Sequence, residues 1–270
     1  MRLSALMLIP ACITSCSSLK TVLYTLDTPR IAAHTQIIIV HISDLHSTIH
    51  NNDQSTLIEK IKTARPDLIV LTGDIIDDVT PRTGAYLLLD GIRGIAPVYY
   101  VAGNHEYMSK DINGIRAELR FRGVQILSDE YKRLAIKGND IVLAGVDDPV
   151  KKIFEDPSYN QQESLRTAFG GLTQLHGYKI LLAHRPERIN MYLEYPFDLI
   201  LSGHTHGGQV RLPFINGLYA PNQGIFPRYG GGLYKHNETT HIISRGLSVM
   251  RFPPRIGNPP ELVIITLRGL

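Results

Sequence analysis

Five short polar clusters carry residue types that bind divalent metals, and each follows an apolar run. They are DLH at Asp44, DIID at Asp74, NHE at Asn104, HRPE at His184 and HTHGG at His204. The donors are carboxylates, imidazoles and one amide, without a thiolate. Such a set suits borderline or hard divalent ions such as Mn²⁺, Fe or Zn²⁺.

The spacing inside two clusters favours shared ligation. Residues i and i+2 of an extended chain point the same way, so Asp44 with His46, and His204 with His206, can each aim two ligands into one site. The candidate ligands number seven in all: Asp44, His46, Asp74, Asn104, His184, His204 and His206. Seven exceeds what one tetrahedral ion needs and suits two ions that share a carboxylate.

Glycines precede a ligand in three clusters, at Gly73, Gly103 and Gly203. A glycine has no side chain, so the backbone can turn sharply beneath a metal at these points. The glycines therefore agree with the prediction that the clusters surround a compact site.

The elements that must position these clusters are strands and helices in alternation. Short apolar runs, typical of strands covered on both faces, occupy 37–42, 68–71, 98–101, 141–146, 179–183 and 199–202. Helical spacing covers 55–64, 84–92 and 112–121, and closing strands are expected at 240–244 and 262–267. This alternation predicts an α/β fold with parallel strands, whose carboxyl ends bring the clusters together.

Composition limits the class of protein. The 270 residues are 43% hydrophobic, with a net charge of +3 from scattered Lys and Arg, so we expect no nucleic-acid partner. The two cysteines are Cys12 and Cys16, which excludes a disulfide framework or thiolate metal site from the rest of the chain. We expect one domain over 21–270.

Residues 1–20 are typical of a targeting segment. Arg2 precedes an apolar stretch over 3–13 that is too short to span a bilayer comfortably, and the residues before Cys16 resemble a bacterial lipobox. Three interpretations stay open: an exported lipoprotein lipidated at Cys16, an uncleaved N-terminal anchor on the inner face, or a plain amphipathic segment. Membrane association is expected, and its side is open.

The ordered set of five clusters, over roughly residues 36–212, resembles the calcineurin-like metallophosphoesterase superfamily. SRGL at Ser244 and PPEL at Pro259 extend the likeness towards a bacterial membrane-associated branch with phosphodiesterases and UDP-diacylglucosamine pyrophosphohydrolases. The resemblance implies a four-layer α-β-β-α sandwich of two mixed sheets, with the metal site at the carboxyl ends of strands.

The resemblance also implies a role for each ligand. Two divalent ions, of which Mn²⁺ is favoured, would share the bridging residue Asp74 and activate a hydroxide between them. The first ion would be held by Asp44, His46 and His206, and the second by Asn104, His184 and His204. His105 would donate a proton to the leaving group, and Asp77 would orient it.

The expected function is hydrolysis of phosphodiester or pyrophosphate bonds. The candidate substrates are a phosphorylated small molecule and a lipid-linked nucleotide such as UDP-2,3-diacylglucosamine. Lipidation at Cys16 conflicts with that lipid, which is met on the cytoplasmic side. The alternative is a non-catalytic, metal-binding interaction scaffold of the same fold.

Other residues have less specific surroundings. Arg245 and Arg251 are candidates for contacting a second phosphate, and Arg185 either reaches a phosphate or forms an ion pair. Asp78 is expected to be a solvated loop charge, whereas Glu106 either is one or supports a ligand. The segment 211–234 is either an apolar wall for a lipid or a loop packed by its own aromatic residues.

Histidines outside the clusters have no ligand spacing. We expect His41 to be a core or edge residue with a satisfied ring. The remaining ones are expected at the surface: His34, His50, His176, His236 and His241.

Overall fold

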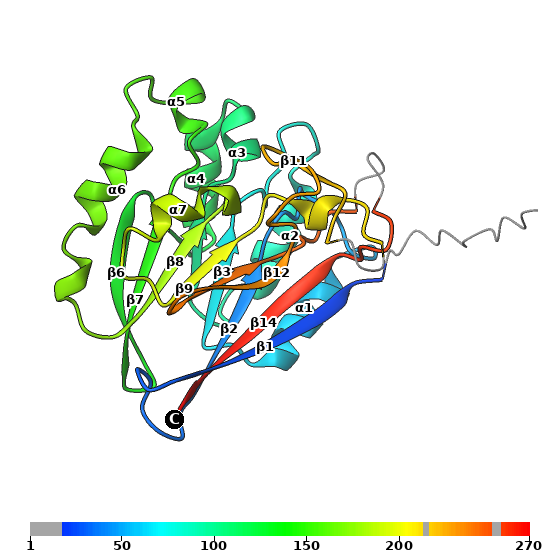
Figure 1. The fold of residues 1–270 in the computed structure, drawn as a ribbon. Coiled ribbons are helices and arrows are strands. Elements are labelled where there is room, and N and C mark those ends of the chain that lie inside the picture. Colours follow the sequence, from blue (N-terminus) through cyan, green and yellow to red (C-terminus); the bar gives the residue numbers. More distant parts are fainter. Residues whose placement is uncertain (1–17, 213–215, 250–254) are drawn as a thin grey trace, which may run out of the picture.

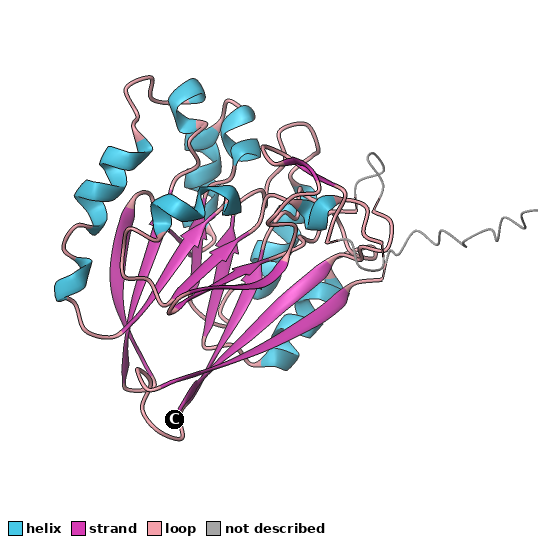
Figure 2. Cartoon of the chain, viewed as in Figure 1, coloured by secondary structure: helices cyan, strands magenta, loops and turns pink. Residues whose placement is uncertain are grey.

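Two six-stranded sheets pack face to face between two layers of helices (Figures 1 and 2). The computed structural model describes residues 18–212, 216–249 and 255–270. Three apolar clusters fill the three spaces between the four layers. The prediction of a four-layer α-β-β-α sandwich with two mixed sheets is therefore confirmed.

The first sheet has four parallel strands at its centre and one side. Its order is β1(Lys20–Thr28), β14(Glu261–Gly269), β2(Gln36–Ile42), β3(Leu68–Thr72), β4(Val98–Val101) and β5(Val124–Ile126). Strands β2 to β5 are parallel, and β14 runs antiparallel to β2. The outer face is covered by α1(Ser55–Ala64), α2(Thr83–Ile92), α3(Asn104–Met108) and α4(Ile112–Phe121).

The second sheet also has a parallel centre. Its order is β12(Gly232–His236), β13(Thr239–Ile243), β9(Leu199–Ser202), β8(Tyr178–Ala183), β7(Asn139–Val146) and β6(Glu130–Ile136). Strands β7, β8, β9 and β13 are parallel. The outer face packs against α6(Gln161–Phe169) and α7(Ile189–Tyr192). A short helix, α5(Lys151–Phe154), precedes α6 in the chain. A two-stranded hairpin, β10(Tyr219–Ala220) and β11(Gly224–Ile225), follows the last ligands.

The core between the sheets fixes their relative position. Its members include Ile39 of β2, Leu182 of β8 and Leu199 of β9, none of which is exposed. Burying one such side chain stabilises the fold by roughly 1.5–3 kcal/mol. The parallel strands of both sheets therefore keep their carboxyl ends at one edge of the sandwich.

The predicted elements are confirmed to within two residues at each end. The structure adds elements that were not predicted, namely the helices α3, α5, α6 and α7 and the four edge strands β1, β5, β6 and β12. Strands β1, β6 and β12 were not predicted, and along each of them exposed positions alternate with less exposed ones. An edge strand with one solvated face does not form a continuous apolar run, which is the pattern that marked the central strands.

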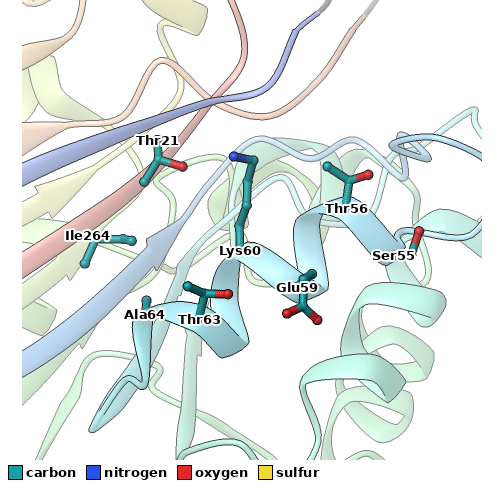
Figure 3. A pocket seen from close by; sticks show the side chains of 8 residues that line it. All are labelled: Thr21, Ser55, Thr56, Glu59, Lys60, Thr63, Ala64 and Ile264. Atoms are coloured by element: carbon teal, nitrogen blue, oxygen red, sulfur yellow. The ribbon is translucent and has the colours of Figure 1, made fainter.

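A groove of about 780 Å³ lies between α1 and the strands β1 and β14 (Figure 3). It is lined by Thr21, Ser55, Thr56, Glu59, Lys60, Thr63, Ala64 and Ile264, and none of these is a candidate ligand. Across the described part of the chain, no helix combines the length and apolarity needed to cross a bilayer. The predicted targeting segment, with Cys12 and Cys16, falls outside the described residues apart from 18–20.

Candidate dinuclear metal centre

The strand ends bring six of the seven candidate ligands into two adjoining groups. One group contains Asp44, His46, Asp74 and His206, and the other contains Asp74, His184 and His204. In each group the potential ligand atoms lie within 4.8 Å of one another. Asp74 belongs to both groups, so its carboxylate is the one placed to bridge two ions.

Distances inside the groups are those of ligand atoms facing a common point. In the first, Nε2 of His46 lies 3.2 Å from Nε2 of His206 and 3.6 Å from Oδ2 of Asp74. In the second, Nε2 of His184 lies 3.1 Å from Oδ2 of Asp74 and 3.1 Å from Nδ1 of His204. Each site thus presents both oxygen and nitrogen donors.

Asn104, the seventh candidate, provides the test of whether the residues fit a metal. It is the first residue of α3 and is buried, yet its Oδ1 has no hydrogen-bond partner among the described residues. A buried amide oxygen without a partner costs free energy unless a ligand satisfies it. The unpaired oxygen, the convergent carboxylates and the imidazoles together fit hard or borderline divalent ions.

The ligands come from strained backbone. Five of the seven have φ in the left-handed region: Asp44 (50°), His46 (48°), Asp74 (52°), His204 (70°) and His206 (47°). Such conformations are uncommon outside glycine and concentrate at functional sites. The backbone at Gly203 also passes too close to Asp44 for a side chain to fit, because a Cβ on Gly203 would lie 2.2 Å from Oδ2 of Asp44.

Outer hydrogen bonds fix the rings of three candidate ligands. Nδ1 of His46 lies 2.9 Å from Oδ1 of Asp77, and Nδ1 of His184 lies 2.7 Å from the carbonyl of Thr72. Nδ1 of His206 lies 3.1 Å from the hydroxyl of Ser248. In all three rings Nε2 is left to face the centre, as expected for metal-binding histidines held by a second partner.

His204 is oriented the other way round. Its Nδ1 faces His184, and its Nε2 points outwards to Nδ2 of Asn222 at 3.0 Å and a guanidinium nitrogen of Arg185 at 3.3 Å. No spacing signal predicts Asn222 at the site. Arg185 directly follows a ligand, and of its two open interpretations the structure shows an ion pair, with Asp148.

Glu106 supports the segment that contains Asp74. Its carboxylate is fully buried and accepts hydrogen bonds from the backbone N–H groups of Asp74, Ile75, Ile76 and Gly103. Of the two interpretations left open for Glu106, support of a ligand is therefore the correct one.

Electrostatics at the centre reflect the clustered carboxylates. Burial lowers the pKa of His184, but the charge of Asp74 outweighs it and raises that pKa to about 10. Burial and the nearby charge of His184 lower the pKa of His204, and burial lowers that of His206. His204 and His206 are therefore neutral, as metal binding requires, whereas His184 must release the proton that Asp74 stabilises when a cation binds.

His105 lies at the side of the first group, in contact with two carboxylates. Its Nδ1 is 3.3 Å from Oδ1 of Asp77 and 2.6 Å from Oδ1 of Asp78. Burial lowers the pKa of His105, but Asp77, Asp74 and Asp78 together raise it to about 10. The prediction that Asp78 is only a solvated charge is wrong, because it makes the shorter contact with His105.

Of the two arginines expected to bind phosphate, only Arg245 lies within the described residues. Nε and NH2 of Arg245 both contact Oε2 of Glu261, which is almost fully buried, so the charge of Arg245 is already compensated. This corrects the expectation for Arg245. Arg251 lies outside the described residues.

Two histidines expected at the surface are buried. Nε2 of His50 donates to the carbonyl of Leu247, and His241 faces the hydroxyl of Ser202. These predictions are wrong because both residues occupy positions that the packing of the second sheet and the ligand loops covers. His41 is a core residue as expected, with Nε2 2.7 Å from the hydroxyl of Thr72, although its Nδ1 has no described partner.

The segment after the last ligands combines both predicted features. Tyr229 is buried and packs against Tyr234, with ring centroids 5.2 Å apart. Other apolar side chains of the segment are exposed, by 38 to 69%: Leu212, Leu218, Tyr219, Ile225 and Phe226. The backbone N–H of Leu218 donates to the carbonyl of Gly208, which ties this surface to the ligand segment.

Comparison with known proteins agrees with this geometry. The profile described as calcineurin-like phosphoesterase matches residues 37–208. The chain belongs to the calcineurin-like phosphoesterase family. It is therefore a metal-dependent phosphoesterase, and both groups of ligands lie inside the matched region.

Curated relatives of this phosphoesterase come from several organisms. The metallophosphoesterase YkuE of Bacillus subtilis, named as uncharacterized, is 31% identical over 86% of this chain and 79% of its own length. An uncharacterized metallophosphoesterase of Aquifex aeolicus is 30% identical over 91% and 90%. A bovine transmembrane protein with a metallophosphoesterase domain is 32% identical over 86% of this chain, which spans only 53% of that protein.

Solved structures share the fold at low identity. The NAD nucleotidase of Haemophilus influenzae aligns with a TM-score of 0.54 and 17% identity, over 78% of this chain and 45% of that one. GAP50, named as an anchor in the inner membrane complex of Plasmodium, aligns with a TM-score of 0.54 and 13% identity over 86% and 81%. These similarities establish the architecture of the phosphoesterase and nothing about its substrate.

Proposed function

We propose that this phosphoesterase hydrolyses phosphodiester or pyrophosphate bonds with two divalent ions, of which Mn²⁺ best suits the donors. The observation that carries the proposal is the pair of ligand groups joined by Asp74. Asp44, His46 and His206 would hold one ion, and Asn104, His184 and His204 the other. Bound ions would lower the pKa of a shared water and neutralise charge on the phosphoryl oxygens.

His105 is the group placed to protonate the leaving oxygen. With a pKa raised to about 10 it carries a proton at neutral pH, and it is partly exposed beside the first ligand group. Asp77 and Asp78 hold its Nδ1, which leaves Nε2 to face a substrate. General acid catalysis of this kind typically contributes about 10²–10⁴-fold in rate.

The exposed apolar surface around β10 and β11 favours a substrate with a lipid portion. Its side chains, Leu218, Tyr219, Ile225 and Phe226 among them, are exposed next to a segment that contacts His204 through Asn222. A contiguous apolar surface near a site is typical of contact with acyl chains or a bilayer. A lipid-linked nucleotide such as UDP-2,3-diacylglucosamine, met at a membrane surface, is the substrate we propose.

A substrate screen on protein lacking residues 1–20 tests the function. Metal analysis should find about two ions per chain, and hydrolysis of bis(p-nitrophenyl) phosphate should depend on Mn²⁺. A lipid-linked nucleotide should be cleaved faster than the same nucleotide without acyl chains. Metal bound without any hydrolysis would favour the alternative of a metal-binding interaction scaffold, and equal rates with and without acyl chains would contradict the lipid assignment.

A further inference from the structure

Arg185 and Asn222 meet at one point beside the second ligand group. A guanidinium nitrogen of Arg185 lies 3.3 Å from Nε2 of His204, and the amide nitrogen of Asn222 lies 3.0 Å from the same atom. Arg185 follows His184 at the end of β8, whereas Asn222 belongs to the turn between β10 and β11. Two segments that are far apart in sequence thus place donors at the rim of the centre.

The position of Arg185 is fixed by a buried carboxylate. Nε of Arg185 donates to Oδ2 of Asp148 at 2.6 Å, and Asp148 is 2% exposed at the end of β7. The second carboxylate near Arg185, that of Glu187, is 3.6 Å from its NH1 nitrogen, which is beyond hydrogen-bond distance. Arg185 is therefore held on one side by Asp148, and the NH1 group that faces His204 forms only a longer ion pair with Glu187 and no hydrogen bond to it.

The donors at this point outnumber the acceptors. If Nδ1 of His204 binds an ion, its neutral ring carries the hydrogen on Nε2, which is then a donor as well. Arg185, Asn222 and His204 would then direct three N–H groups at one place. Turning the Asn222 amide over would offer one oxygen to His204, but the amino group of Arg185 would still lack an acceptor there. Three converging donors, one of them cationic, favour an anionic oxygen between them.

We propose that Arg185 and Asn222 form a subsite for a second phosphoryl group of the substrate, next to the phosphorus that reacts. This inference rests on the proposed function and sharpens it, because a pyrophosphate has such a group and a simple diester has none. Arg185 is a specificity residue in this arrangement, and Asp148 is a positioning residue that acts through it.

The experiment compares two anions that are not hydrolysed. Binding of methylenediphosphonate and of inorganic phosphate to the Mn²⁺-loaded protein is measured by calorimetry. We expect Arg185→Gln to weaken methylenediphosphonate about 10–100-fold, the effect of one hydrogen bond to a charged group, and phosphate less than about threefold. Arg185→Lys keeps the charge without the planar fork and should lose an intermediate amount.

A matched variant separates the subsite from a general loss of positive charge. Arg188→Gln removes the same charge three residues away, at a side chain with no ion pair among the described residues, and should change neither affinity. Metal content and thermal unfolding are measured for every variant. If Arg185→Gln loses metal or folds poorly, Asn222→Ala decides, since that side chain is exposed; it should weaken methylenediphosphonate about 3–10-fold and retain phosphate binding.

The outcomes distinguish the two proposals. Wild-type protein that binds no metal would overturn the proposed function and the subsite together. The subsite alone would be overturned if the wild-type protein binds Mn²⁺ and is active, but the variants show no selectivity. That is the result if Arg185→Gln and Asn222→Ala weaken the binding of methylenediphosphonate and phosphate equally, or weaken the binding of neither. A selective loss of methylenediphosphonate supports it.

Discussion

Two sets of buried histidines lie in the same sandwich and have different surroundings. The four in the ligand groups each face another imidazole or a carboxylate: His46, His184, His204 and His206. His41 and His241 lie in strands, and each faces a single hydroxyl while the second ring nitrogen has no described partner. All six are less than 10% exposed, so burial does not separate the sets. What separates them is whether several strand ends converge on the ring.

The pKa values differ between the two strand histidines and one ligand histidine, His184. Burial lowers the pKa of His41 and of His241 to about 3, because nothing nearby stabilises the charged ring. At His184 the charge of Asp74 overcomes burial and raises the pKa. Burial keeps the two strand histidines neutral, and it also lowers the pKa of His204 and His206, so His184 differs because it lies directly against Asp74.

Removing the carboxylate shared by both ligand groups should have the largest effect. Asp74→Ala should reduce bound metal from about two ions to below one and lower kcat/KM by at least about 10³-fold, because both sites lose an oxygen ligand. Metal analysis and phosphodiester hydrolysis measure this. His241→Ala, which removes a histidine of the other set, should keep the metal; if Asp74→Ala also kept it, the assignment of Asp74 would be wrong.

Substitution of His105 should reduce the rate and leave the metal in place. His105→Ala should lower kcat about 10²–10⁴-fold for alkyl esters, which need a proton at the leaving oxygen, and less for p-nitrophenyl esters. The two classes of ester are compared at saturating Mn²⁺. An empty metal site in this variant would show that His105 is a ligand instead.

Substitution of Glu106 tests how far metal binding depends on the hydrogen bonds that hold the Asp74 segment. In Glu106→Gln one of two carboxylate oxygens becomes a donor facing backbone N–H groups, so the segment with Asp74 should shift. We expect metal affinity to fall about 10–100-fold, measured by competition with a chelator. Glu118→Gln, on the exposed side of α4, is the control, and an unchanged affinity for Glu106→Gln would remove the assigned role.

Acid should destabilise the fold through the two strand histidines, His41 and His241. Their pKa lies near 3 in the folded chain and near 6.5 when unfolded, so below pH 6.5 protons bind preferentially to the unfolded state. The free energy of unfolding should fall by about 2 kcal/mol for each ring between pH 7 and 5. Urea unfolding of His241→Gln should show about half of that combined loss, while exposed His176→Gln keeps it. If the free energy of unfolding of His241→Gln fell as steeply with pH as that of the wild type, the lowered pKa of His241 would be contradicted.

Much of the fold could be predicted because the central strands are buried on both faces. Their apolar runs mark β2, β3, β4, β7, β8 and β9, and the polar cluster after five of these marks the centre. The edge strand β1 could not be found in this way, since its outward face is solvated and Leu23 on it is 71% exposed.

The limits of prediction at the centre follow from contacts that are distant in sequence. The pair Asp147–Asp148 also follows a strand, yet nothing in its spacing indicates that Asp148 holds Arg185. Asn222 reaches His204 only because the hairpin folds back over the ligand segment. Asp77 contacts both His46 and His105, whereas Asp78 contacts His105, and these contacts depend on the turn that contains the two aspartates.

The left-handed backbone at five of the ligands should affect how long the protein stays folded when its metal is removed. Each such residue costs on the order of 1 kcal/mol, a cost that cations would offset by tying the loops together. Chelation should therefore do more than abolish activity. It should accelerate amide hydrogen exchange and proteolytic cleavage at these loops before it does so elsewhere in the chain. Cellular metal supply would then set the lifetime of the folded chain as well as its turnover.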